Sequence, residues 1–199
     1  MGTTIHEFLA IGNFLTCIYG KAASGKTNIC ISTAAKFSKE GKVAFIDTEN
    51  TFSPKRFHEF GGNLSNLIFY KANSFKEQSK AIAALLPISN KLKLVVIDSL
   101  NSHYRTLIQQ SPKVNSAFSR HLSELSDLAR SNVPVIMTSQ VYSTEKGTQM
   151  VGSNMLRNWS ASIIRLEQEN KRSVFIEKHP SEESKSVNFE IKEDSVNCL

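Results

Sequence analysis

Apolar residues gather along the chain in short continuous runs, separated by segments in which they recur at helical spacing. A run without polar interruptions is typical of a strand buried on both faces, as in a parallel sheet covered by helices on either side. We therefore predict an α/β fold built from βαβ units. The predicted parallel strands occupy residues 14–19, 43–47, 67–70, 94–98 and 133–139.

Helices are predicted between these strands from apolar spacing and from end signals. Gly41 ends the first of them, because glycine readily adopts the left-handed conformation that follows a helix. Pro54 favours the first turn of a second helix, and the hydroxyl of Ser74 can cap a third. The predicted helices span residues 28–39, 54–60, 75–86 and 118–129.

The pattern changes from residue 160 onward, where three apolar runs are joined by short hairpin-like connectors. This change predicts an antiparallel edge on a mostly parallel sheet. Two polar stretches, residues 106–116 and 141–154, lack clear periodicity, and we interpret both as loops. We expect a single domain over residues 1–199, without a helical domain before it.

Composition places the chain among ordinary globular domains. Its 199 residues are 40% hydrophobic and 21% charged, enough to bury a core without metals or disulfides. Three scattered cysteines and five histidines show neither C-x-x-C nor metal-ligand spacing, which fits a reduced intracellular protein. No stretch resembles a signal peptide or a membrane span, so we expect a cytosolic location.

The net charge of +6 and the pI of about 9.2 permit nucleic-acid binding. Many basic proteins bind no nucleic acid, so the charge is informative only if it is localised on the surface.

The segment Gly20-Lys21-Ala22-Ala23-Ser24-Gly25-Lys26-Thr27 matches G-x-x-x-x-G-K-[ST] between a predicted strand and a predicted helix. In that setting backbone N–H groups and the helix dipole converge on a phosphate. We expect Lys26 to reach the β- and γ-phosphates and the Thr27 hydroxyl to bind Mg²⁺. Asn28, which begins the predicted helix, joins this set of nucleotide contacts. The alternative is a glycine-rich turn that binds nothing.

Polar side chains follow the apolar strands at the edge where open parallel sheets bind ligands. Asp98 ends its strand in the Walker B pattern and could hold Mg²⁺ or its water shell. Glu49 follows the second strand and could orient and deprotonate a water, although a solvated loop carboxylate is the alternative. Gln140 follows the fifth strand, close to the expected γ-phosphate.

Together these motifs resemble the RecA-type recombinase core, and most specifically the archaeal RadB paralogues, over nearly the whole chain. The resemblance implies a RecA-like P-loop NTPase core with ATP and Mg²⁺ as cofactors. The residues that carry it lie in segments 19–27, 44–49, 52–56, 75–78, 95–99, 102–105, 133–136 and 139–141.

The same resemblance assigns roles to individual residues. It makes Glu49 the catalytic glutamate, places Arg56 against the adenine, where a guanidinium can stack, and has Gln140 couple the γ-phosphate to the loop that follows. The stretches 106–116 and 141–154 would then face DNA. Each cation near them could also be an ordinary solvated charge. The candidate DNA contacts are Arg105, Lys113, Lys146 and Arg157.

Three functions remain open from the sequence. The first is an ATP- and DNA-binding repair accessory protein with weak hydrolysis, assisting a RadA-type recombinase or a Holliday-junction resolvase, with homo-oligomers as an option. The second is a DNA-stimulated ATPase that acts directly in strand exchange. The third, a small-molecule P-loop kinase, is disfavoured because no arginine-rich lid follows the Walker B strand.

Overall fold

The computed structural model describes residues 4–144 and 147–199. Within them a mixed sheet of nine strands has the order β11-β10-β9-β8-β1-β5-β4-β2-β3. The parallel strands are β1 (Leu15–Gly20), β2 (Lys42–Asp47), β3 (Leu67–Lys71), β4 (Leu92–Asp98), β5 (Val135–Ser139) and β8 (Ser162–Gln168). The antiparallel strands are β9 (Arg172–Lys178), β10 (Lys185–Ile191) and β11 (Val196–Cys198).

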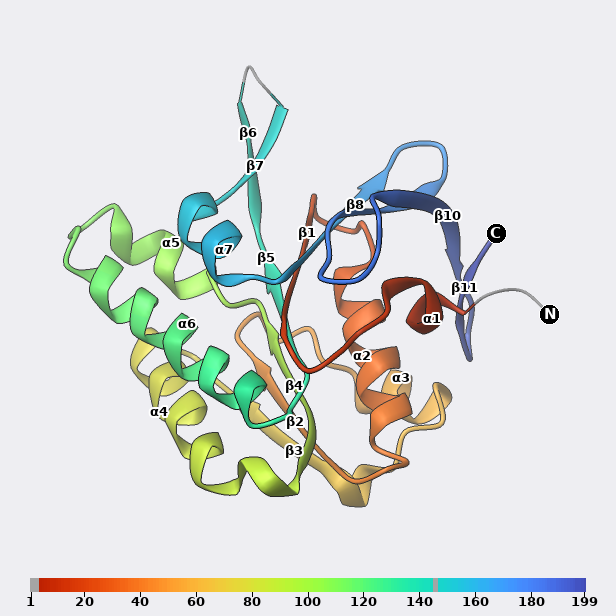
Figure 1. Ribbon diagram of the computed structural model, residues 1–199, viewed down its shortest axis with the longest axis horizontal. Coiled ribbons are helices and arrows are strands. Elements are labelled where there is room, and N and C mark those ends of the chain that lie inside the picture. The colour runs from red at the N-terminus through yellow and green to blue at the C-terminus, as the bar shows by residue number, and fades with distance from the viewer. Residues whose placement is uncertain (1–3, 145–146) are drawn as a thin grey trace.

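Helices cover both faces of the sheet, as Figure 1 shows. One face carries α1 (Ile5–Leu9), α2 (Lys26–Phe37) and α3 (Pro54–Glu59). The other carries α4 (Phe75–Leu85), α5 (Ser102–Ile108), α6 (Val114–Arg130) and α7 (Ser153–Trp159). Two short 3₁₀ helices precede β3 and β4, at Leu64–Asn66 and Leu86–Lys91.

The continuous apolar runs are explained by two hydrophobic cores, one on each side of the sheet. Successive side chains of a strand point to opposite faces. On β4, Val95 and Ile97 pack into the core under α4 and α6, while Leu94 and Val96 pack into the core under α2. All four are fully buried. The predicted α/β class with an antiparallel carboxyl-terminal edge is therefore confirmed.

The two stretches interpreted as loops contain regular structure, and that part of the prediction is wrong. Helix α5 continues to Ile108 and α6 begins at Val114, so only a short turn lies between them. The second stretch holds β6 (Val141–Thr144) and β7 (Gly147–Met150), paired antiparallel, and then the start of α7. In Figure 1 this hairpin projects away from the main sheet. Polar hairpins lack the burial pattern that reveals a strand.

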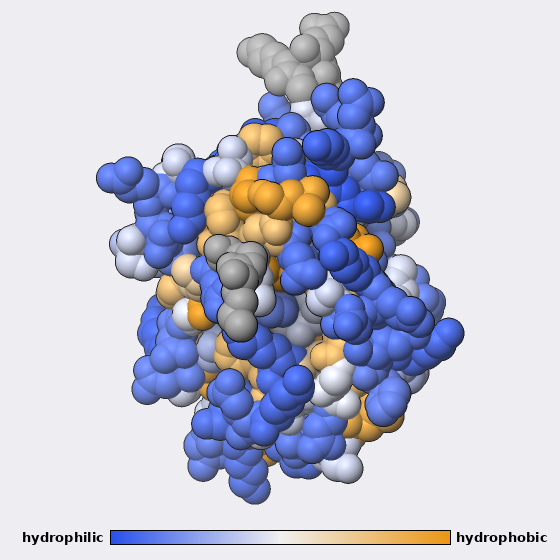
Figure 2. Space-filling view, turned by 90° about the vertical axis from the view of Figure 1, so that its right-hand side faces the viewer, coloured by the Kyte–Doolittle hydropathy of each residue, from blue (hydrophilic) through white to orange (hydrophobic). Residues whose placement is uncertain are grey.

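The ends of the described chain meet at the antiparallel edge. Thr4 caps α1 through a reciprocal capping box with Glu7, and it forms an isolated bridge with Asn197 beside β11. Figure 2 shows this side of the molecule as largely hydrophilic, with its largest apolar area in the upper centre and smaller ones elsewhere. Within the described residues, no helix is both long and apolar enough to cross a membrane.

Candidate nucleotide-binding site

The carboxyl ends of β1, β5, β4 and β2 bring the candidate residues to one edge of the sheet. Parallel pairing sets Asp47 opposite Asp98 and Tyr19 opposite Ser139. The loop after β1, the Walker B aspartate and the residue after β5 therefore lie side by side, as the sequence predicted from strand ends.

The loop between β1 and α2 has the backbone of an anion cradle. Gly25 has a φ of 107°, in the left-handed region, at the N-cap of α2. Gly25 has no side chain that could cap this helix, which leaves the first N–H groups of α2 available to an anion. A Cβ on Gly20 would lie 2.4 Å from the carbonyl oxygen of Leu166 on β8, so only glycine fits there. These features fit the predicted triphosphate.

The side chain of Lys26 folds back onto the phosphate loop. Its Nζ donates to the carbonyl oxygens of Gly20, at 2.8 Å, and Lys21, at 2.9 Å. Burial lowers the pKa of Lys26, and the nearby carboxylates of Asp98 and Glu49 oppose that shift. The ammonium is thus held at the cradle by groups that a phosphate oxygen could join or replace.

Asp98 is buried at the end of β4 and is held by two hydroxyl groups. Thr27 Oγ1 donates to its Oδ2 at 2.7 Å, and Thr138 Oγ1 donates to its Oδ1. Burial raises the pKa of Asp98 in spite of these hydrogen bonds. Within the described residues no group of three His, Cys, Asp or Glu side chains could hold a metal ion. One carboxylate and one hydroxyl suit Mg²⁺, which keeps several waters and takes its remaining ligands from phosphates.

Glu49 is turned toward the same cleft by a network that the sequence did not reveal. Asp47 accepts hydrogen bonds from the backbone N–H groups of Glu49 and Phe52, both at 2.9 Å, and so fixes the turn after β2. The Glu49 Oε1 accepts from Gln140 Nε2 at 2.8 Å and from the Ser99 hydroxyl. Glu49 and Gln140, 91 positions apart in sequence, are thus in direct contact.

The cleft between the phosphate loop and β5 is where these groups meet. Arg105, predicted to contact DNA, extends from α5 to this cleft. The residues that line it are Gly20, Lys21, Ala22, Lys26, Glu49, Arg105, Gln140 and Val141.

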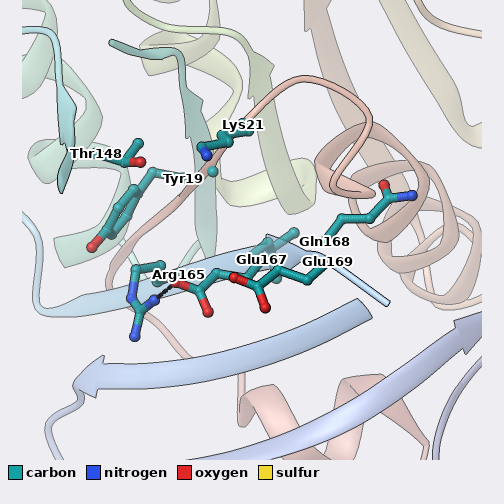
Figure 3. Close-up of a pocket in the computed structure, with 9 residues that line it drawn as sticks. Tyr19, Lys21, Thr148, Arg165, Glu167, Gln168 and Glu169 are labelled. Atoms are coloured by element: carbon teal, nitrogen blue, oxygen red, sulfur yellow. Dashed lines mark hydrogen bonds and ion pairs between the residues drawn. The ribbon is translucent and has the colours of Figure 1, made fainter. Parts of the chain in front are cut away.

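A second hollow lies on the β8 side of the same loop (Figure 3). Glu167 and Glu169 line it, and carboxylates repel a triphosphate. Arg165 there pairs with Glu167 and donates to Glu177 at 2.8 Å. Tyr19 also donates to Glu177, at 2.7 Å. The arrangement favours the Lys26 side for phosphates.

Arg56 reaches the region beside the cradle but is already engaged. Its Nε donates to Asn28 Oδ1 at 3.1 Å, and its Nη atoms donate to the carbonyl oxygens of Lys192 and Glu193. The guanidinium lies over the ring of Phe60, 4.4 Å from the centroid. A nucleobase would therefore stack on the opposite face, and the position of Arg56 against adenine stays a prediction.

The remaining predicted DNA contacts are dispersed. Lys113 is exposed just before α6. Arg157, on α7, pairs with Glu177 at 3.3 Å. Lys146 lies outside the described residues.

Comparisons with known proteins agree on one family. The Rad51 family model matches residues 11–197. DNA repair and recombination protein RadB from Methanocaldococcus jannaschii is 36% identical over 197 residues, covering 93% of each chain. The RadB protein of Methanococcus maripaludis is 33% identical over 93% of this chain and 91% of its own. The solved structure of a RadB recombinase superposes with a TM-score of 0.82 at 30% identity, covering 98% of this chain and 96% of the other.

Proposed function

The chain belongs to the Rad51 family of RecA-like ATPases, among the RadB proteins, and from this we propose that it is a DNA repair and recombination protein that binds Mg²⁺-ATP and DNA and hydrolyses ATP slowly. The observation that carries the proposal is the hydrogen bond between Glu49 and Gln140. It joins the candidate catalytic carboxylate to the residue from which the β6–β7 hairpin departs.

The nucleotide part of the proposal assigns a role to each group in the cleft. Backbone N–H groups of residues 20–27 and the Lys26 ammonium hold the phosphates, and Thr27 with Asp98 holds Mg²⁺ and its waters. Bound Mg²⁺ supplies neutralisation of the charge that develops on the phosphoryl oxygens. Glu49 Oε2 has no partner among the described residues, which leaves it free to accept a hydrogen bond from water. Arg56 would contact the base with the guanidinium face opposite Phe60.

The DNA part rests on the projecting hairpin and on four candidate cations. Arg105 on α5, Lys113 before α6, Lys146 and Arg157 are the cations proposed to contact phosphates. Because each phosphate contact releases counterions, the affinity for DNA should fall steeply as salt rises. Measuring binding of a labelled single strand between about 50 and 200 mM salt tests this directly. An affinity for DNA that does not change with salt would contradict binding through phosphates.

Turnover of ATP with and without single-stranded DNA tests the proposal as a whole. Glu49→Gln keeps a side-chain oxygen that can accept from Gln140 and Ser99, so the fold and ATP binding should survive while hydrolysis is lost. Glu183→Gln, at an exposed carboxylate between β9 and β10, is the matched control and should hydrolyse ATP normally. Equal turnover by both variants would contradict the role of Glu49.

The dependence on DNA separates two versions of this function. Little stimulation with intact ATP binding favours an accessory role beside a RadA-type recombinase or a Holliday-junction resolvase. A several-fold stimulation that Glu49→Gln abolishes favours an enzyme that acts in strand exchange itself.

A further inference from the structure

Asn101 is a buried polar residue in the turn between β4 and α5. Asparagine at a helix N-cap ordinarily accepts a hydrogen bond from the first turn of its own helix. Asn101 occupies the N-cap of α5, yet its side chain makes no such bond. The side chain is fully buried, so its polar atoms must find partners elsewhere.

Those partners lie at the end of β5 and beyond the hairpin. Asn101 Oδ1 accepts from the backbone N–H of Gln140 at 2.9 Å, which identifies this atom as the oxygen of the carboxamide. Asn101 Nδ2 lies within donating distance of the carbonyl oxygens of Gln140, at 3.2 Å, and Val151, at 3.1 Å. It also faces Ser139 Oγ at 2.9 Å.

Gln140 and Val151 flank the β6–β7 hairpin at its two ends. Val141 pairs with Met150 in the last rung of its ladder, and the Val151 N–H donates to the Gln140 carbonyl at 3.3 Å. One carboxamide therefore fastens both ends of the element that projects from the sheet in Figure 1. It ties them to the turn that follows the Walker B strand.

The backbone and the side chain of Gln140 have separate attachments. The Asn101 side chain bonds both the backbone N–H and the backbone carbonyl of Gln140. The side chain of Gln140 instead donates to Glu49 in the nucleotide cleft. These hydrogen bonds of Asn101, hereafter the clamp, join the backbone of residue 140 to that of Val151, so a displacement that reaches residue 140 through its side chain moves both ends of the hairpin together. Without the clamp, the same displacement would be lost in local movement.

We propose that Asn101 is a positioning residue that couples the nucleotide cleft to the β6–β7 hairpin. This inference rests on the proposed function, because it takes the cleft to bind nucleotide. Asn101 touches neither the phosphate loop nor Glu49 among its hydrogen-bond partners, so its loss should leave nucleotide affinity within about twofold of the parent.

Two variants test the clamp in different ways. Asn101→Ala removes all of its side-chain hydrogen bonds. Asn101→Asp keeps the size and the acceptor for the Gln140 N–H but places an oxygen against two carbonyl oxygens, which opposes the clamp without leaving a cavity. Asn154→Ala, at an exposed asparagine on α7, is the matched control.

The hairpin can be observed without DNA. Tyr142 is 47% exposed on β6, and Trp159 is the only tryptophan in the sequence. A Tyr142→Trp, Trp159→Phe background therefore reports on the hairpin alone. We expect its emission to change when a non-hydrolysable ATP analogue and Mg²⁺ bind, both in this background and with Asn154→Ala. We expect no change with either Asn101 variant, although both bind the analogue.

Affinity for single-stranded DNA gives the second readout, in chains without the reporter. In the parent and the Asn154→Ala control, the analogue should change the affinity for single-stranded DNA by at least about fivefold. In the Asn101 variants that affinity should be the same with and without the analogue. Variants that bind the analogue and keep the parent's response would overturn the inference, as would a parent whose hairpin does not respond. Absence of DNA binding by the parent would instead refute the proposed function, while the tryptophan signal would still test Asn101.

Amide hydrogen exchange on the unmodified chain tests the inference even if neither Asn101 variant folds. In the unmodified chain the Gln140 amide should stay protected with and without the analogue, because its acceptor is Asn101. Exchange of that amide at the rate of a free peptide would overturn the inference.

Discussion

Removal of the Thr138 hydroxyl probes the charge that the site places on Asp98. Thr138→Val keeps the shape of the side chain and deletes one of the two hydroxyl donors to the buried carboxylate. Thr16→Val is its matched control. Thr16 is also fully buried, on the adjacent strand β1, but its hydroxyl has no hydrogen-bond partner among the described residues.

The two substitutions should change stability in opposite directions. A hydrogen bond to a charged group contributes about 1.5–3 kcal/mol, so Thr138→Val should lower the free energy of unfolding by about 2 kcal/mol. Removing a buried hydroxyl that has no partner relieves a desolvation penalty, so Thr16→Val should raise it by about 1 kcal/mol. The difference of about 3 kcal/mol corresponds to about 6–12 °C in Tm for a chain of this size.

Urea unfolding at pH 7, followed by circular dichroism, measures both values on the same scale. Equal changes for the two variants would refute the reasoning, because the hydroxyl of Thr138 would then contribute nothing through Asp98. A larger m value in only one variant would show a change in the unfolded or native ensemble and not in this hydrogen bond.

Two further predictions concern single side chains. Lys26→Ala should weaken ATP binding by at least about a hundredfold, since charge-assisted bonds to phosphates are lost. Calorimetric titration of the folded variant measures this affinity. An unchanged affinity would mean that the loop binds no triphosphate. Burial, with a smaller effect of Arg120, lowers the pKa of His121 from 6.5 to about 4. Between those pH values only the unfolded chain gains a proton at His121. The free energy of unfolding should therefore decrease as the pH is lowered, by up to about 1.4 kcal/mol per pH unit. His121→Phe, next to the stacked ring of Phe75, should flatten that slope, and an identical slope would contradict the assignment.

Strands and the phosphate loop were predictable because their signals are local. Residues 94–98 are apolar on both faces and end in Asp98, and the structure has β4 at Leu92–Asp98. The loop motif fixes its own backbone, with Gly25 in the left-handed region that its position requires. Each of these features is written within a few consecutive residues, where spacing and residue type carry the information.

The remaining features depend on contacts between distant segments. Asn101 meets Gln140 and Val151, 39 and 50 positions away, and nothing around Asn101 in the sequence distinguishes it from a helix cap. The hairpin after β5 is short, and among its described residues only the pair at its base, Val141 and Met150, joins the core, so the sequence shows no clear alternation. Arg56 is held by carbonyl oxygens of residues 192 and 193, which no side-chain pattern encodes.

The central claim is that the loop from Gly20 to Thr27 grips the triphosphate of Mg²⁺-ATP beside Glu49. A crystal structure of the chain with Mg²⁺ and a non-hydrolysable ATP analogue tests it most directly. We predict phosphate density at the N-terminus of α2, with Lys26 Nζ on the β- and γ-phosphates and Mg²⁺ on the Thr27 hydroxyl. Analogue bound elsewhere, with Lys26 still on the Gly20 and Lys21 carbonyl oxygens, would contradict the account.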